Sequence, residues 1–211
     1  MWQNTHNKPV EVWYFVEVVN DFVDGRLGIN KHAMRAVVHM VSCLEALLAL
    51  PGAKVVETNW GAIIETEDRI YAIIFQLDEH AATEEEYLAS NEGKYFPYPH
   101  SLTGDPGMES VDEMQPFKKC AYIVVTKPFI FDPITVKTLK DVVKRIGKIV
   151  KIRFFGFLTS MCVLGAAVMA RANFQDAEIV IDAKGTADTS TLAHGTALEI
   201  LERNFMTIIN R

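Results

Sequence analysis

The stretch KIRFFGFLTSMCVLGAAVMARANFQDAEIVIDA, residues 151–183, decides the fold. A run of β-type residues ends near Gly156, and a helix-like, Ala-rich stretch follows from about Ser160 to Asn173. The apolar run AEIVIDA (177–183) then has the pattern of a second strand. Strand, helix and strand in this order are typical of two parallel strands joined by a crossover helix.

The same alternation extends toward both ends of the chain. Strands are expected at 10–19, 69–77, 120–126, 148–157, 177–183 and 205–210, and helices at 31–50, 133–147, 160–173 and 190–203. This pattern predicts an α/β protein in three layers, α/β/α, with a mainly parallel, Rossmann-like, six-stranded sheet. Residues 1–211 are expected to form a single domain, with a hairpin added at about 54–68.

The composition narrows the class of protein. Apolar residues make up 49% of the chain, the formal net charge is −6, and no basic stripe is visible, so nucleic acid is not an expected partner. The odd count of 3 cysteines suggests a reducing compartment. The N-terminus lacks a signal-peptide pattern, and Gly156, Thr159 and Ser160 interrupt the apolar run 154–170, so no membrane span is expected. These features predict a cytoplasmic protein.

Several chemically versatile side chains follow the predicted strands. Glu17 lies within the first apolar run, Asp78 and His80 follow the second strand, Lys127 follows the third, and Cys162 follows the strand that ends near Gly156. In open α/β sheets, ligands bind at the carboxyl ends of the strands. We therefore expect an acid, metal-type ligands, a lysine and a thiol to meet at one edge.

Each of these residues also has a structural interpretation. Cys162 could be a small buried hydrophobe, and Lys127 a solvated strand end. A buried carboxylate at Glu17 needs a partner, and Lys127 is a natural one. With Ser160 as N-cap, the Cys162 thiol would lie in the first helical turn, where the helix dipole and a nearby lysine favour thiolate.

These residues resemble a known family. Glu17, Lys127 and Cys162, with NDF (20–22) after the acid and GFLTSMCV (156–163) around the thiol, are similar to the isochorismatase-like cysteine hydrolases. The resemblance covers nearly the whole chain and implies that family's hydrolase fold, with these three residues as its catalytic set. The acid motif differs, because the family usually has D-x-Q-N-D-F and this chain has EVVNDF (17–22).

One branch, the nicotinamidases, is similar in more detail. Their metal ligands match Asp78 and His80 in DEH (78–80) and His100 in FPYPHSLTGDPG (96–107), and a further ligand position falls at Glu86. The resemblance implies a divalent metal, Zn²⁺ first and Mn²⁺ or Fe²⁺ as alternatives. Glu86 has a competing role, because TEEE (83–86) is also a helix-capping pattern.

The resemblance implies hydrolysis of nicotinamide to nicotinate and ammonia, a reaction of NAD metabolism. Glu17 would accept the Cys162 proton, and the backbone N–H groups of Leu158 and Cys162 would hold the oxyanion. The family also has a cis peptide at the position of Phe157–Leu158. The pyridine ring would lie between Phe22 and a second aromatic residue, Phe96 or Tyr98.

Departures from the family pattern leave alternatives open. Glu17 adds a methylene to the acid, Val19 replaces a glutamine, and Glu86 replaces a histidine. The chain could therefore be a metal-independent hydrolase of another small substrate, or an impaired member that acts as a binding protein. A small-molecule amide is the expected partner, and self-association is possible because many relatives form oligomers.

Overall fold

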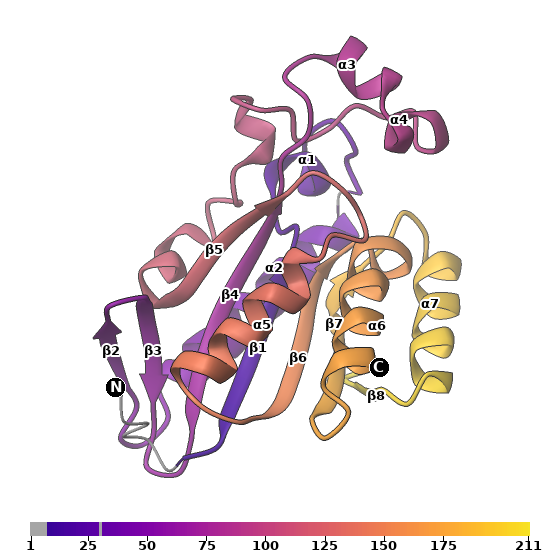
Figure 1. Ribbon diagram of the computed structural model, residues 1–211. Helices are drawn as coiled ribbons and strands as arrows, with labels where there is room; N and C mark the ends of the chain where they lie inside the picture. Colours follow the sequence, from indigo (N-terminus) through magenta and orange to yellow (C-terminus); the bar gives the residue numbers. More distant parts are fainter. Residues whose placement is uncertain (1–7, 30) are drawn as a thin grey trace.

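A sheet of eight strands forms the centre of the molecule (Figure 1). The computed structural model describes residues 8–29 and 31–211. The strand order is β2-β3-β4-β1-β6-β7-β8, and β5 pairs with β4. The strands are β1 Val10–Val16, β2 Lys54–Thr58, β3 Gly61–Glu65, β4 Ile70–Asp78, β5 Ala121–Lys127, β6 Ile149–Phe157, β7 Glu178–Ala187 and β8 Thr207–Ile209.

Strands β1 and β4 to β8 run parallel, as the sequence predicts. Strand β1 lies between β4 and β6, and every residue of Val10–Val16 is buried. A strand covered on both faces needs apolar side chains on both, which explains its nearly unbroken apolar run. The predicted α/β architecture with a mainly parallel sheet is confirmed.

Helices cover both faces of the sheet (Figure 1). One apolar core packs β1, β4 and β6 against α5, α6 and α7, and a second packs the opposite face against α2. The α-helices are α1 Asn20–Val23, α2 Lys31–Leu48, α3 Glu84–Ala89, α4 Asn91–Tyr95, α5 Ile134–Arg145, α6 Leu164–Asn173 and α7 Thr191–Arg203. Short 3-10 turns η1 (Pro106–Met108) and η2 (Gln115–Cys120) and a π-helical turn η3 (Thr159–Val163) complete the elements.

The sheet has eight strands because the β2–β3 hairpin continues it. Strand β3 pairs antiparallel with the first residues of β4, at Ile64 and Tyr71, while β5 pairs parallel with β4 from Ile73 onward. Gly61 lies at the junction with a φ of +131°, and a Cβ there would be 1.8 Å from the Tyr122 carbonyl oxygen. The hairpin and β5 therefore share one edge of β4, end to end.

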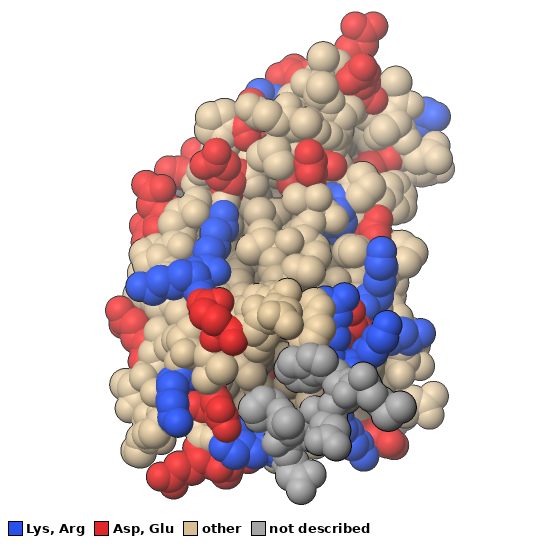
Figure 2. All heavy atoms as spheres, turned by 60° about the vertical axis from the view of Figure 1, so that its left-hand side comes forward, with Lys and Arg blue, Asp and Glu red and all other residues tan. Residues whose placement is uncertain are grey.

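The chain between β4 and β5, residues 79–120, first rises above the carboxyl edge of the sheet and then descends to the start of β5, and we call it the β4–β5 excursion (Figure 1). Arg26 ties it to the body through ion pairs with Glu84 (2.9 Å) and Asp105 (2.8 Å). Exposed glutamates 84–86 begin α3, and Figure 2 shows acidic side chains at the top of the molecule, where α3 lies in Figure 1. The outer surface of the excursion is thus acidic.

Within residues 8–29 and 31–211, no helix is both long and apolar enough to cross a bilayer. The apolar run 154–170 divides into the end of β6, the turn η3 and most of α6.

Candidate active site

Glu17, Lys127 and Cys162 meet at the carboxyl ends of β1, β5 and β6. The Lys127 ammonium forms an ion pair with Glu17, and its Nζ lies 3.8 Å from the Cys162 Sγ. A Glu17 carboxylate oxygen lies within 4.8 Å of that sulfur. The three residues are exposed by only 0%, 1% and 4%, respectively. An acid, an ammonium group and a thiol therefore share an enclosed site.

Burial sets the protonation of this group. It raises the pKa of the Glu17 carboxyl well above its ordinary value, and the charge of Asp78 adds to the rise while Lys127 opposes it. Burial likewise raises the pKa of the Cys162 thiol, followed by the effect of the Glu17 charge. Lys127 lowers the pKa of the thiol, as expected, but burial and the Glu17 charge outweigh it. A carboxylate with a raised pKa is a stronger base for the thiol proton.

A tight approach of two strand ends places the cysteine. Gly156 has a φ of +116°, and a Cβ there would be 1.8 Å from the Val16 carbonyl oxygen, so only glycine fits. The peptide bond between Phe157 and Leu158 is cis, as expected. Leu158 directly precedes the π-helical turn that contains Cys162, which keeps the two expected oxyanion donors on one turn.

Ser160 has a different role from the predicted helix cap. Its backbone N–H donates to Asp188 Oδ2 at 2.7 Å, and α6 begins only at Leu164. The Thr159 hydroxyl donates to the Ala187 carbonyl at 3.0 Å. The turn carrying Cys162 is thus bonded to the end of β7.

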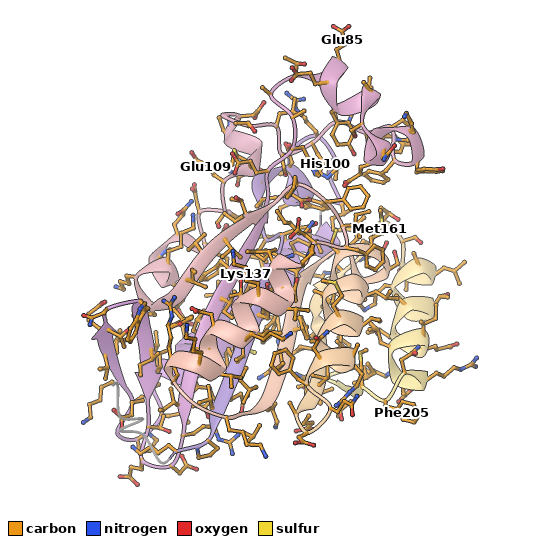
Figure 3. All side chains as sticks on the ribbon, viewed as in Figure 1. Glu85, His100, Glu109, Lys137, Met161 and Phe205 are labelled. Carbon is orange, nitrogen blue, oxygen red and sulfur yellow. The ribbon has the colours of Figure 1, made fainter. Side chains whose placement is uncertain are left out.

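Asp78, His80 and His100 form a second buried cluster beside the first. The two Nε2 atoms are 3.2 Å apart, and they lie 3.5 Å (His80) and 3.4 Å (His100) from Asp78 Oδ2. Asp78 ends β4, whereas the histidines come from the excursion, where His80 and Leu102 form a short bridge. Figure 3 shows His100 below α3 and α4, toward the sheet.

The hydrogen bonds of this cluster suit a cation. His80 Nδ1 faces the Pro128 carbonyl at 3.2 Å, and His100 Nδ1 faces the Tyr98 carbonyl at 2.7 Å. A carbonyl only accepts, so each Nδ1 carries a proton, and in the neutral ring each Nε2 keeps a lone pair. Asp78 Oδ2 is buried without a hydrogen-bond partner in the described chain. Three electron-pair donors thus converge, in an arrangement that fits a divalent metal.

Glu86 does not join this cluster. It is exposed on α3, and its backbone N–H donates to the Thr83 hydroxyl at 3.2 Å, so the capping role of TEEE is the one observed. Glu92 on α4 lies there instead, buried, with Oε1 at 3.6 Å from His80 Nε2. Its Oε2 has no partner among the described residues. The ligand position assigned to Glu86 is therefore corrected, and Glu92 is the acid beside the histidines.

Asp78 connects the two clusters. Its Oδ1 accepts a hydrogen bond from Lys127 at 2.5 Å, while its Oδ2 faces the imidazoles. Burial opposes the charge on Asp78, yet the Lys127 charge and the adjacent imidazoles hold its pKa well below the ordinary value. Burial also opposes the charge on Lys127, but Asp78, Cys162 and Glu17 outweigh it and raise the pKa of its ammonium.

The aromatic residues pack around His100. The Phe22 ring meets the imidazole edge-on with centroids 5.3 Å apart, and the Phe96 ring does so at 5.6 Å. The Tyr98 ring meets the Phe96 ring edge-on with centroids 5.1 Å apart, and Tyr98 is 58% exposed. Phe22 and Phe96 therefore lie at the Asp78–His80–His100 cluster, and Tyr98 lies at the protein surface.

The comparison with protein families matches the model of the Isochorismatase domain to residues 15–211. The chain belongs to the isochorismatase family. This assignment supports a hydrolase function for the chain. A comparison with curated proteins gives no match.

Three solved structures illustrate which proteins share the fold of this chain. The nicotinamidase/pyrazinamidase of Bacillus subtilis has a TM-score of 0.69 at 20% identity, covering 95% of this chain and 99% of that one. The pyrazinamidase of Pyrococcus horikoshii in complex with zinc has 0.67 at 16% identity, with 96% and 100% covered. The N-carbamoylsarcosine amidase of Thermoplasma acidophilum has 0.63 at 20% identity, with 95% of each chain covered.

Sequence reasoning missed three acids of this isochorismatase-family site. Glu92 carries no motif, and α4 brings it back to His80 only through a break in the helix at Ser90. Asp188, which accepts the Ser160 N–H, lies in the loop before α7, where no sequence pattern indicated it. Asp21 is part of the NDF motif, but its contact with the excursion is made with Ser101, which lies far along the chain.

Proposed function

We propose that this protein hydrolyses the C–N bond of a small amide with Cys162 as the nucleophile, and that nicotinamide is its substrate. One observation carries the proposal: the buried Glu17–Lys127–Cys162 group is joined through Asp78 to a histidine pair suited to a metal. The similarity of the fold to that of a nicotinamidase/pyrazinamidase supports this substrate class. The reaction would belong to NAD metabolism.

The proposed reaction has two halves. Glu17 takes the thiol proton, and the Cys162 sulfur attacks the amide carbon, with the oxyanion held by the backbone N–H groups of Leu158 and Cys162. The Glu17 proton then passes to the leaving nitrogen, which departs as ammonia and leaves a thioester. In the second half Glu17 takes a proton from water, the hydroxide cleaves the thioester, and the thiol is restored. Lys127 stabilises the anionic forms of its neighbours.

We propose that Asp78, His80, His100 and Glu92 would hold a divalent ion, Zn²⁺ first. The two imidazoles and two carboxylates form a nitrogen and oxygen donor set that suits Zn²⁺, Mn²⁺ or Fe²⁺. When bound, such an ion would offer the substrate's ring nitrogen an electrophilic contact that orients the amide. Phe22 and Phe96 would limit the space beside that ring, and Tyr98 would cover it from outside.

The test is ammonia release from nicotinamide by protein stripped of metal and by protein reloaded with Zn²⁺. We expect turnover only in the reloaded protein, and none in Cys162→Ala. Cys43→Ala is the matched control, because Cys43 lies outside the site, half-buried on α2. Turnover by Cys162→Ala at the wild-type rate would exclude Cys162 as the nucleophile. Equal rates with and without metal would exclude a requirement for metal in the reaction.

A second candidate is hydrolysis of a different small linear amide. It is favoured by the altered acid motif, in which Glu17 and Val19 change the site from the family pattern. The similarity to an N-carbamoylsarcosine amidase adds support. A panel of carbamoyl and carboxamide substrates distinguishes the two, since the preferred substrate has the highest kcat/KM. No turnover of any member of the panel would favour a binding protein.

A further inference from the structure

The peptide unit at Ser101 connects both histidines of the cluster. Ser101 is fully buried and has a φ of +44°, a left-handed conformation that is uncommon for residues other than glycine. Its carbonyl accepts the backbone N–H of His80 at 3.0 Å, and its chain neighbour is His100. The conformation of this one residue therefore influences where both imidazoles point.

The Ser101 N–H is held by a carboxylate from a distant part of the chain. Asp21 Oδ2 accepts it at 2.7 Å, and Asp21 Oδ1 accepts the backbone N–H of Arg26 at 3.1 Å. Asp21 lies on α1, 80 positions before Ser101 in the sequence, and is only 3% exposed. Each oxygen of the carboxylate thus has its own N–H donor, and one of these donors, Ser101, directly follows His100.

Two glycines fix the carboxylate in place. A Cβ on Gly25 would be 2.5 Å from Asp21 Oδ1, and a Cβ on Gly107 would be 2.3 Å from Asp21 Oδ2. Real Cβ atoms do not approach so closely, so the carboxylate lies tightly between two bare backbone segments. Asp21 therefore has little freedom to move away from Ser101.

We propose that Asp21 is a positioning residue for the metal-binding histidines: by holding the Ser101 peptide in its left-handed conformation, it fixes the directions of His80 and His100. This inference rests on the proposed metal site. Asp21 plays no part in the proton transfers described above. Its neighbour Phe22 packs on the His100 ring, so α1 supports the imidazole through both a hydrogen bond and an aromatic contact.

Asp21→Asn is the direct test. A carboxamide keeps one acceptor oxygen but turns an NH₂ group toward the other N–H donor, so one of the two hydrogen bonds is lost. We expect Zn²⁺ affinity, measured by competition with a chromophoric chelator, to fall about 10- to 100-fold. The Co²⁺-substituted protein should also show a changed visible absorption spectrum. Asp24→Asn is the matched control, since it removes the same charge from an exposed residue of the same segment and should bind like wild type.

Gly107→Ala is the second variant and guards against a folding failure. It keeps the charge of Asp21 but forces the carboxylate away from Gly107, and it should weaken Zn²⁺ binding in the same direction. The inference is overturned if both variants bind Zn²⁺ within twofold of wild type. It is also overturned if the variants melt at lower temperature without metal but keep the full Zn²⁺-induced rise in melting temperature. Wild type that binds no Zn²⁺ would overturn the proposed metal site together with this inference.

Discussion

At the scale of single residues, Glu17 is the most informative position. Its backbone has a φ of +53° at the end of β1, and its N–H donates to the Gln76 carbonyl at 2.7 Å. The longer side chain of glutamate still contacts Lys127 and lies near the Cys162 sulfur. The extra methylene is thus compatible with the geometry that acid, ammonium and thiol need.

Glu17→Gln should change two properties in opposite directions. The negative charge of Glu17 helps to raise the pKa of the Cys162 thiol, so its removal should lower that pKa and move the alkylation of Cys162 by iodoacetamide to lower pH. Turnover should nevertheless fall about 10²- to 10⁴-fold, because the proposed general base is gone. Peptide mass spectrometry across pH 6 to about pH 10 measures the first effect, and ammonia release the second. An alkylation profile shifted to higher pH would contradict the assignment.

At the scale of elements, the strand-to-turn junction at Gly156 holds the site together. Gly156→Ala combines a strained φ with a collision against the Val16 carbonyl, which directly precedes Glu17. Strain alone costs about 1–3 kcal/mol. We expect a larger loss in the free energy of unfolding, measured in urea, together with loss of turnover.

Gly104→Ala provides the matched comparison. Gly104 also has a positive φ, +81°, but a Cβ there meets nothing within 4 Å. Its loss of stability should therefore be confined to backbone strain. Equal losses in the two variants would show that the approach of Gly156 to β1 contributes nothing.

Local patterns predicted most of these elements, and they failed where two local signals competed or where contacts were distant. The alternation around Gly156 predicted β6 and a following helix, but the π-helical turn that carries Cys162 depends on the bond from Ser160 to Asp188, which no local pattern reveals. TEEE satisfied both a ligand spacing and a helix cap, and the cap prevailed because α3 turns Glu86 toward solvent. Glu92 reaches His80 only through tertiary packing.

At the scale of the whole molecule, an ion-pair network around one buried carboxylate joins the α2 layer to the sheet. Asp182 on β7 contacts Arg153 on β6 and His39 on α2, and it also accepts a hydrogen bond from Asn210 near the C-terminus at 3.0 Å. The Asp182 side chain is completely buried. Strand alternation predicted the six parallel strands, but strand order and the joining of the hairpin arise from pairings between distant segments, which sequence spacing does not specify.

Asp182→Asn should destabilise the protein in a pH-dependent way. Burial opposes the Asp182 charge, but Arg153 and His39 outweigh it and lower the pKa of that carboxyl. A lowered pKa stabilises the fold above the ordinary aspartate value of about 3.9, and that stabilisation is lost as the pH falls through the folded-state pKa. Breaking the pair should cost about 3–5 kcal/mol at neutral pH.

Urea unfolding at a series of pH values checks this result. The difference between wild type and Asp182→Asn should be largest near neutrality and should narrow below about pH 4. Asp176→Asn is the control, because Asp176 is exposed in the turn before β7 and should show no such difference. A gap that widens on acidification would contradict the assigned direction.

The shared carboxylate of Asp78 makes the two halves of the site thermodynamically interdependent. One oxygen holds the Lys127 ammonium and the other faces the imidazoles, so any cation that binds at the second oxygen draws electron density from the first. Linkage is reciprocal: if a bound cation changes the proton affinity of Lys127 by some factor, then loss of that proton changes the cation affinity by the same factor. Acylation of the neighbouring Cys162 would then change the cation affinity of the histidines, and ligand exchange at the histidines would in turn change the protonation of Cys162.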